Sequence, residues 1–239
     1  FQSVGELKST EALYIADGGI EYALETGTFP NYSYPAWSTR AGATVANPCP
    51  SASAIALGNG NFCVDPPTVL TAAITAAALV IPVVSTSGFP AAGMIRIDSE
   101  VMRYDSTTAT TFVLNNPGRR GQAGTAAAAH SLDAAVYPAT TLGGGALPNN
   151  CTALASVTVN FDPAMFLSNG VFKIDSEYFH YTGKTAASFT GVTRCFRGST
   201  SAIHNPNTAV YQQWITSTGS VSTLVGGTAQ RVVRVTVDQ

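Results

Sequence analysis

Two stretches of the sequence carry an aspartate, a glutamate two positions later and a histidine further on: Asp98, Glu100 and His130, and Asp175, Glu177 and His204. Paired carboxylates can act as general acid and base or as oxygen ligands for calcium, and a histidine can move a proton at neutral pH. In both stretches, however, the two carboxylates flank a tight Asp-Ser turn, and the alternating Asp or Asn ligands of an EF-hand are absent. The pattern therefore favours turn formation and ion pairing over catalysis or metal binding.

Other signatures of enzymes are missing from the sequence. It contains no G-x-S-x-G, H-E-x-x-H or C-x-x-C-H motif, and the glycine-rich stretches 57–61 and 142–145 are not followed by helical patterns that could cradle a phosphate. We predict that the protein is not an enzyme and has no catalytic residues, no metal and no cofactor.

The carboxylates belong to an internal repeat. Residues 69–137 and 153–211 align over GFPAAGMIRIDSEVMRYDS and MFLSNGVFKIDSEYFHYTG, followed in each by an Arg-Gly, a histidine and a Val-Tyr. From Glu100 to Arg120 is twenty positions, and so is Glu177 to Arg197. We predict that each glutamate pairs with its arginine and tethers the Arg-Gly turn. The alternative is that these are independent surface charges of little energetic consequence.

Local patterns place the repeated residues on strands and turns. Two short apolar runs flank each Asp-Ser pair, which is the chemistry of a β-hairpin turn, so Asp98 and Asp175 are predicted to form turns. His130 and His204 precede a polar turn and an Ala-Val-Tyr strand, and we expect each ring nitrogen to bond a loop carbonyl. On this alignment the single length difference is a three-residue deletion between the Arg-Gly and the histidine.

Composition excludes several classes of protein. Of 239 residues, 11% are charged, against roughly 25% in an average domain, and the net charge is −2. No basic stripe is available for nucleic acid, so we predict no nucleic-acid partner. With 45% hydrophobic residues the chain is too apolar to stay disordered and should form a packed core.

The four cysteines indicate disulfides rather than zinc. They form no C-x-x-C pair, and an even number at wide spacing favours two disulfides in an oxidising compartment, with buried free thiols as the alternative. Counting leaves three pairings open. Position along the chain favours Cys49–Cys63 within one irregular region and Cys151–Cys195 around the second repeat, where Gly118 of the first repeat aligns with Cys195.

Residues 3–25 predict an amphipathic helix, with Leu7 and Tyr14 on one face and Ile20 and Leu24 on an adjoining apolar stripe. Gly27 and Pro30 follow as stop signals. The apolar window 70–84 contains Pro82 and many Thr and Ala residues, so it favours buried strands over a membrane span. The rest of the chain predicts short strands.

The helix resembles type IV pilin-like proteins, especially large minor pilins and pseudopilins. Residues 9–25, STEALYIADGGIEYALE, are similar to the segment that follows the membrane-spanning half-helix in that family, and residues 215–237 are similar to its terminal hairpin. The repeats also resemble a module of phage structural proteins. The apolar half-helix itself is lacking in this sequence, so the resemblance implies an anchor that is missing or is a separate short apolar chain.

We therefore expect an α+β fold, in which an amphipathic N-terminal helix packs on a β-rich headgroup containing two duplicated hairpin modules. The expected segments are the helix (1–30), an irregular stapled region (31–67), the two modules (68–138 and 151–213) and a C-terminal hairpin (214–239). The resemblance implies a structural subunit of a bacterial extracellular filament that binds other pilin-like subunits through an assembly helix, represented by Val4, Leu7, Tyr14, Ile20 and Leu24. The alternatives are a phage or virion surface protein and a secreted carbohydrate-binding or adhesion module.

Overall fold

The computed structural model describes residues 4–25, 54–212, 214–223 and 228–236. The chain divides into two compact units. One combines residues 1–67 with 214–239, and the other is the intervening segment 68–213. Each unit is described by itself below.

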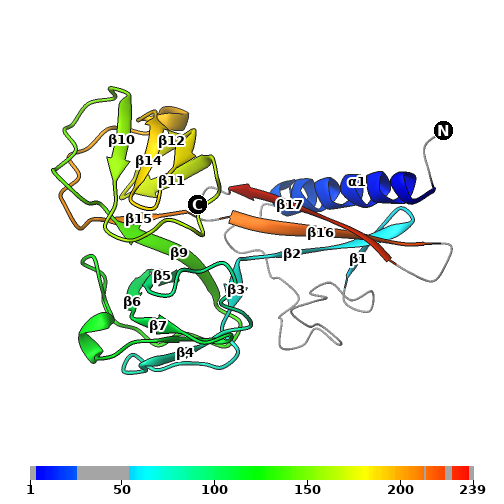
Figure 1. The fold of residues 1–239 in the computed structure, drawn as a ribbon, viewed down its shortest axis with the longest axis horizontal. Coiled ribbons are helices and arrows are strands. Elements are labelled where there is room, and N and C mark those ends of the chain that lie inside the picture. The colour runs from blue at the N-terminus through cyan, green and yellow to red at the C-terminus, as the bar shows by residue number, and fades with distance from the viewer. Residues whose placement is uncertain (1–3, 26–53, 213, 224–227, 237–239) are drawn as a thin grey trace. The chain divides into compact units, whose positions relative to one another are not determined.

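The first unit places one helix on an antiparallel sheet (Figure 1). Helix α1 spans Val4–Glu25. The sheet has the order β1-β2-β16-β17, with the bounds Ile55–Leu57, Gly60–Asp65, Trp214–Ser222 and Thr228–Thr236. Strands β16 and β17 form a long hairpin in which Trp214 pairs with Thr236 and Ser222 with Thr228.

The buried side of α1 is a stripe of small and aliphatic residues spaced three and four apart: Ala12, Ile15, Ala16, Gly19 and Ile20. These residues pack with Phe62 and Val64 of β2 and Ile215 of β16. Ile20 is buried, as expected. Leu7, which was expected to be covered by neighbouring subunits or exposed in an isolated one, is 53% exposed, and Tyr14 is 70% exposed. The side chains of Val4 and Leu24 lie outside the described residues.

Close approach of backbones explains the small residues in this stripe. A Cβ atom on Gly219 of β16 would overlap the Ala12 carbonyl oxygen and the Ala16 nitrogen. A Cβ atom on Gly19 would overlap Ser217 and Phe62. The helix can therefore lie directly on β16 only because both elements carry glycine at the crossing.

The second unit is built from short strands in three antiparallel sheets. The largest has the order β12-β11-β15-β9-β5-β6, with the bounds Glu177–Tyr181, Gly170–Ile174, Ala209–Tyr211, Ala135–Thr141, Gly93–Ile97 and Glu100–Tyr104; β3 (Thr68–Val69) also pairs with β9. One smaller sheet is β4-β8-β7, with the bounds Val80–Pro82, Thr111–Val113 and Ser106–Thr107. The other is β10-β14-β13, with the bounds Leu154–Thr158, Ser188–Val192 and Gly183–Lys184. Two short 3-10 turns, η2 (Pro117–Arg119) and η3 (Phe196–Gly198), complete the unit.

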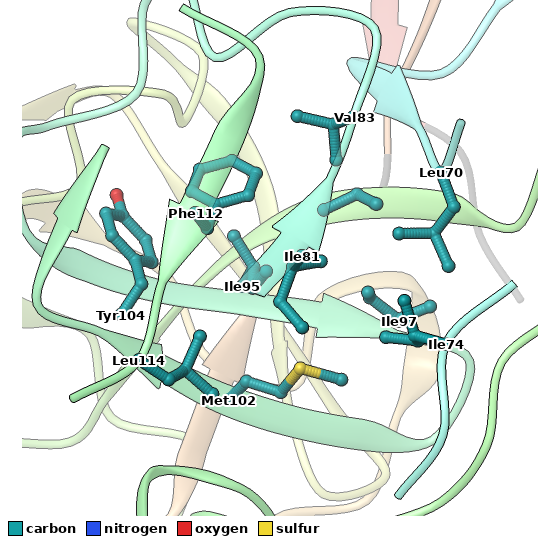
Figure 2. Packing of buried hydrophobic residues seen from close by; sticks show 11 residues of the cluster. Leu70, Ile74, Ile81, Val83, Ile95, Ile97, Met102, Tyr104, Phe112 and Leu114 are labelled. Atoms are coloured by element: carbon teal, nitrogen blue, oxygen red, sulfur yellow. The ribbon is translucent and has the colours of Figure 1, made fainter. Parts of the chain in front are cut away.

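Two large apolar clusters lie in the described part of the second unit, one beside each hairpin that contains an Asp-Ser turn, and a smaller one contains Met94, Val101 and Ala139. The first includes Ile95, Ile97 and Met102 of β5 and β6 together with the apolar window 70–84, whose side chains Leu70, Ile74, Ile81 and Val83 are buried in it (Figure 2). The window therefore forms core strands and loops, as predicted. In the described ranges no helix combines the length and the apolar character that a bilayer crossing requires.

The expected α+β fold class is wrong. The structure is mainly β, with 45% strand against 12% helix and a single helix among the described residues. The expected pair of separate hairpin modules is also not what forms, because β9 pairs with both β5 and β15 and so joins the two hairpins into one seven-stranded sheet. A hairpin with unpaired edges gains hydrogen bonds and buried area when a neighbouring strand pairs with it. The local sequence of a hairpin does not show which strand will do so.

Candidate functional site

The β5–β6 hairpin positions the first group of carboxylates. Ile97 pairs with Glu100 across the two-residue turn, and Asp98 in that turn has a φ of 50°. The left-handed backbone is tolerated by aspartate better than by most residues. Because Glu100 is the first residue of the returning strand, its side chain enters the interior, where it is fully buried.

Five donors surround the Glu100 carboxylate. Arg120 binds it with two parallel bonds, from Nε at 2.7 Å and from Nη2 at 2.8 Å. The backbone N–H groups of Gly121 and Ala128 donate at 3.0 and 2.9 Å, and His130 Nε2 lies at 2.9 Å. The structure thus brings Glu100 and Arg120 together as the spacing predicted. A buried carboxylate with this many donors is satisfied and needs no ligand.

Arg120 also fastens neighbouring loops. Its Nη1 donates to the carbonyl oxygens of Thr75 and Ala78, and its Nη2 donates to that of Ala128. The guanidinium therefore connects the Arg-Gly turn, the hairpin and the apolar window in one network. Arg120 thereby holds three segments around the buried Glu100 carboxylate: its own Arg-Gly turn, the segment of Thr75 and Ala78, and the segment of Ala128.

His130 bridges two carboxylates rather than a loop carbonyl, so the expected acceptor is wrong. Its Nδ1 lies 2.7 Å from Asp98 and its Nε2 lies 2.9 Å from Glu100. Ionised carboxylates only accept hydrogen bonds, so both ring nitrogens fit as donors when the ring carries both of its hydrogens. The first cluster consists of Asp98, Glu100, Arg120 and His130.

The second cluster consists of Asp175, Glu177, Arg194 and His204. Glu177 is fully buried and accepts from Arg194 Nε at 2.9 Å and Nη2 at 2.7 Å. The backbone N–H groups of Cys195 and Ala202 donate to the same carboxylate at 3.2 and 3.1 Å, and His204 spans it and Asp175 at 2.9 and 2.8 Å. The predicted Glu177–Arg197 pair is wrong, because Arg194 occupies that place and Arg197 is exposed.

Backbone conformation shows where the alignment of the two repeats slipped. Gly121 and Cys195, each directly after the buried arginine, have φ values of 58° and 53°, and Ala123 and Arg197 both have 54°. The three-residue difference in length therefore lies before the arginine and not after it. The sequence contains a signal that identifies Arg194 as the equivalent of Arg120, because both arginines lie ten positions before their histidines, His130 and His204.

The disulfide Cys151–Cys195 forms as predicted, with a Cα–Cα distance of 5.4 Å. Its Cys195 corresponds to Gly121 of the first cluster and not to Gly118, because both follow the buried arginine and donate a backbone N–H to the glutamate. The disulfide holds the turn that follows Arg194 in the second cluster, whereas the first cluster has a glycine at the corresponding position. Cys49, and with it the expected Cys49–Cys63 bond, lies outside the described residues.

The electrostatics of both clusters favour ionised glutamates. Burial alone would raise the pKa of Glu100, but hydrogen bonds from Arg120, Ala128, His130 and Gly121 outweigh it and lower the pKa to about 2. Burial also opposes the charge of Glu177, and the bonds from Arg194, His204 and two backbone groups again lower the pKa. The glutamate, arginine and histidine of each cluster are buried, so these residues present no surface to a substrate.

We expect acid to weaken the protein through Glu100. Because its folded pKa is lowered, the carboxylate contributes stability that is complete above its ordinary value of 4.5 and is lost as pH falls toward about 2. The shift corresponds to about 3 kcal/mol. Urea unfolding at several pH values between 5 and 2.5 measures this loss. The double variant Glu100→Gln, Arg120→Met removes the buried pair and should lose less stability over that interval; an equal loss would contradict the assignment.

Besides the two clusters, the described part of the chain contains a groove but no metal-binding group of side chains. No group of three or more His, Cys, Asp or Glu side chains there could hold a metal ion. One open groove lies in the first unit between α1 and the β1–β2 turn, lined by Leu7, Tyr14, Ile15, Leu57 and Asn59 among others. Glu11 at this groove accepts from Lys8 at 2.8 Å and from Asn59 at 3.2 Å.

Comparison with known proteins gives no match of this chain to a family model, to a curated protein or to a solved structure. Its function is therefore inferred from the residues and their geometry.

Proposed function

We propose that the protein is a structural subunit of an extracellular bacterial filament of the type IV pilus or secretion-pseudopilus kind. In this proposal it assembles with other pilin-like subunits through α1. The observation that carries the proposal is the division of α1 into two faces. One face packs on β16 through Ala12, Ala16 and Gly19, while Leu7, Leu13 and Tyr14 remain exposed.

An exposed apolar helix face of this kind favours a partner. Leu7 and Tyr14 also line the open groove beside the β1–β2 turn, so the exposed side chains are contiguous with a concave surface. Surfaces that combine apolar side chains with a groove commonly bind other proteins. The described part of α1 thus packs on the sheet through residues 12–20, while Leu7 and Tyr14 are exposed on the side that this proposal assigns to subunit contacts.

The two buried clusters support a structural role for the second unit. Each fixes loops around a satisfied carboxylate that no substrate can reach, which suits a rigid surface domain more than an active site. A chain that carries few charges and a disulfide also suits an extracellular location.

Leu7→Glu is expected to abolish incorporation into filaments while leaving the folded monomer intact, because Leu7 is exposed and a charge there obstructs only apolar contacts with a neighbour. Filaments sheared from producing cells and quantified with an antibody to the protein measure incorporation. Ile203→Glu is the matched control, since Ile203 is similarly exposed but lies in the second unit. Normal incorporation of Leu7→Glu would contradict the proposed function.

A further inference from the structure

Opposite charges are segregated onto two elements of the first unit. Helix α1 contains five acidic residues and one lysine, whereas β17 contains two arginines and no acidic residue. In a chain with 11% charged residues this separation leaves an acidic helix and a basic strand. The described acidic side chains that face outward include Asp17 and Glu21, and the arginines are Arg231 and Arg234.

These charges have no ion-pair partner among the described residues. Asp17, Glu21, Arg231 and Arg234 are exposed, and none of them forms an ion pair with another residue that the structure describes. The Arg234 guanidinium lies over the Trp214 ring, 5.2 Å from its centroid, which holds the side chain against the sheet. Acidic and basic side chains are thus both available to a partner.

The acidic and basic surfaces point in opposite directions. Val233 and Val235 of β17 pack on the α1 side of the sheet, so the alternating residues Val232 and Arg234 lie on its other face. On α1, Leu13 and Asp17 lie opposite the stripe that contacts the sheet. Figure 1 shows α1 lying along the β16–β17 hairpin. Arg231 alternates with Val232 and pairs with Gly219, so it lies on the α1 side. The outward face of α1 is therefore acidic, and the opposite face of β17 carries Arg234.

The two surfaces match in spacing and in character. Leu13 and Asp17 are one helical turn apart, about 6 Å between their Cβ atoms. Val232 and Arg234 are two strand residues apart, about 7 Å. Each surface thus presents an exposed apolar side chain beside a charge, and Val232 is 54% exposed. An aliphatic contact and an ion pair can form together when one surface meets the other.

We propose that copies of this chain associate head to tail, with the outward face of α1 in one copy (Leu13, Tyr14, Asp17 and Glu21) seated on the face of β17 that points away from α1 in the next (Val232 and Arg234). The inference rests on the proposed filament function and names the surfaces that it uses. The partner is a second copy because the same chain carries both complementary charges. Two different surfaces that face opposite ways make a heterologous contact, which propagates into an open filament unless rotation closes it.

Charge reversal with mutual rescue tests this interface in the full 239-residue chain. One variant carries Asp17→Lys and Glu21→Lys, and the other carries Arg234→Glu. Each alone has two surfaces of like charge, so each should self-associate about tenfold or more weakly than the unchanged chain. An equimolar mixture restores every opposite-charge contact and should recover association. Sedimentation velocity at low salt and at 0.5 M salt, with protein concentration varied, measures all three samples.

Three results would overturn the interface: a chain that stays monomeric at low salt, variants that associate as strongly as the unchanged chain, or a mixture that associates no better than its components. Arg103→Glu is the control for net charge, since it lies in the second unit and should change association little. Thermal unfolding shows that each variant is folded. If the charge-reversal test fails but Leu7→Glu is still excluded from filaments, only the named surfaces are rejected. If Leu7→Glu is incorporated normally, the filament function itself is rejected.

Discussion

Replacing Arg194 with alanine is expected to destabilise the second unit by about 3–5 kcal/mol, whereas replacing Arg197 with alanine should cost less than about 1 kcal/mol. Arg194 is buried and supplies two of the five bonds to the Glu177 carboxylate, and it also donates to the carbonyl oxygens of Pro148 and Ala202. Its loss leaves a buried negative charge without its cation. Arg197 lies only three positions away but is exposed, so its removal uncovers no buried charge.

Urea unfolding followed by far-UV circular dichroism measures this difference, because the second unit contains most of the strands. The paired variants are matched in residue type and nearly in sequence position, so any general effect of losing an arginine cancels. Arg120→Ala should behave as Arg194→Ala does, since Arg120 binds Glu100 in the same bidentate way. Equal effects of Arg194→Ala and Arg197→Ala would show that Glu177 does not depend on Arg194.

Gly219→Val is expected to destabilise the first unit by about 3 kcal/mol or more, the upper range for overpacking a tight contact. A side chain at this position of β16 meets the backbone of α1 at Ala12 and Ala16, and helix backbone cannot move aside as a flexible side chain can. The helix must either lift from the sheet or the strand must shift its register. Both lose the burial of Ile15 and Ile20 against the sheet.

Tryptophan fluorescence during urea unfolding reports this change, because both tryptophans, Trp37 and Trp214, belong to the first unit. Ser222→Val is the matched control: it lies on the same strand but is exposed, and valine suits a strand. The transition of the second unit, followed by circular dichroism, should be unchanged. Normal stability of Gly219→Val would mean that α1 does not lie directly on β16.

The sequence alone was sufficient for features that depend on nearby residues. The extent of α1 follows from its helix-forming composition and the stop signals after it, and the Asp-Ser turns follow from hairpin chemistry. The spacing of Glu100 and Arg120 predicted a bond that the structure contains. The Cys151–Cys195 disulfide was also predictable, because both cysteines lie close to one repeated segment.

Tertiary structure decided the features that depend on what packs across the chain. Which side of α1 lies on the sheet was set by the glycine crossing at Gly219, which is far away in sequence. Pairing of β9 with β15 joined two hairpins into one sheet. The unpaired N–H and C=O groups at a strand edge can bond any neighbouring strand, so the partner depends on the tertiary structure. Arg194 rather than Arg197 binds Glu177, and the left-handed backbone at Cys195 and Arg197 marks the turn that corresponds to the one at Gly121 and Ala123. The twenty positions counted from each glutamate did not identify this turn, whereas the ten positions from each buried arginine to its histidine agree with it.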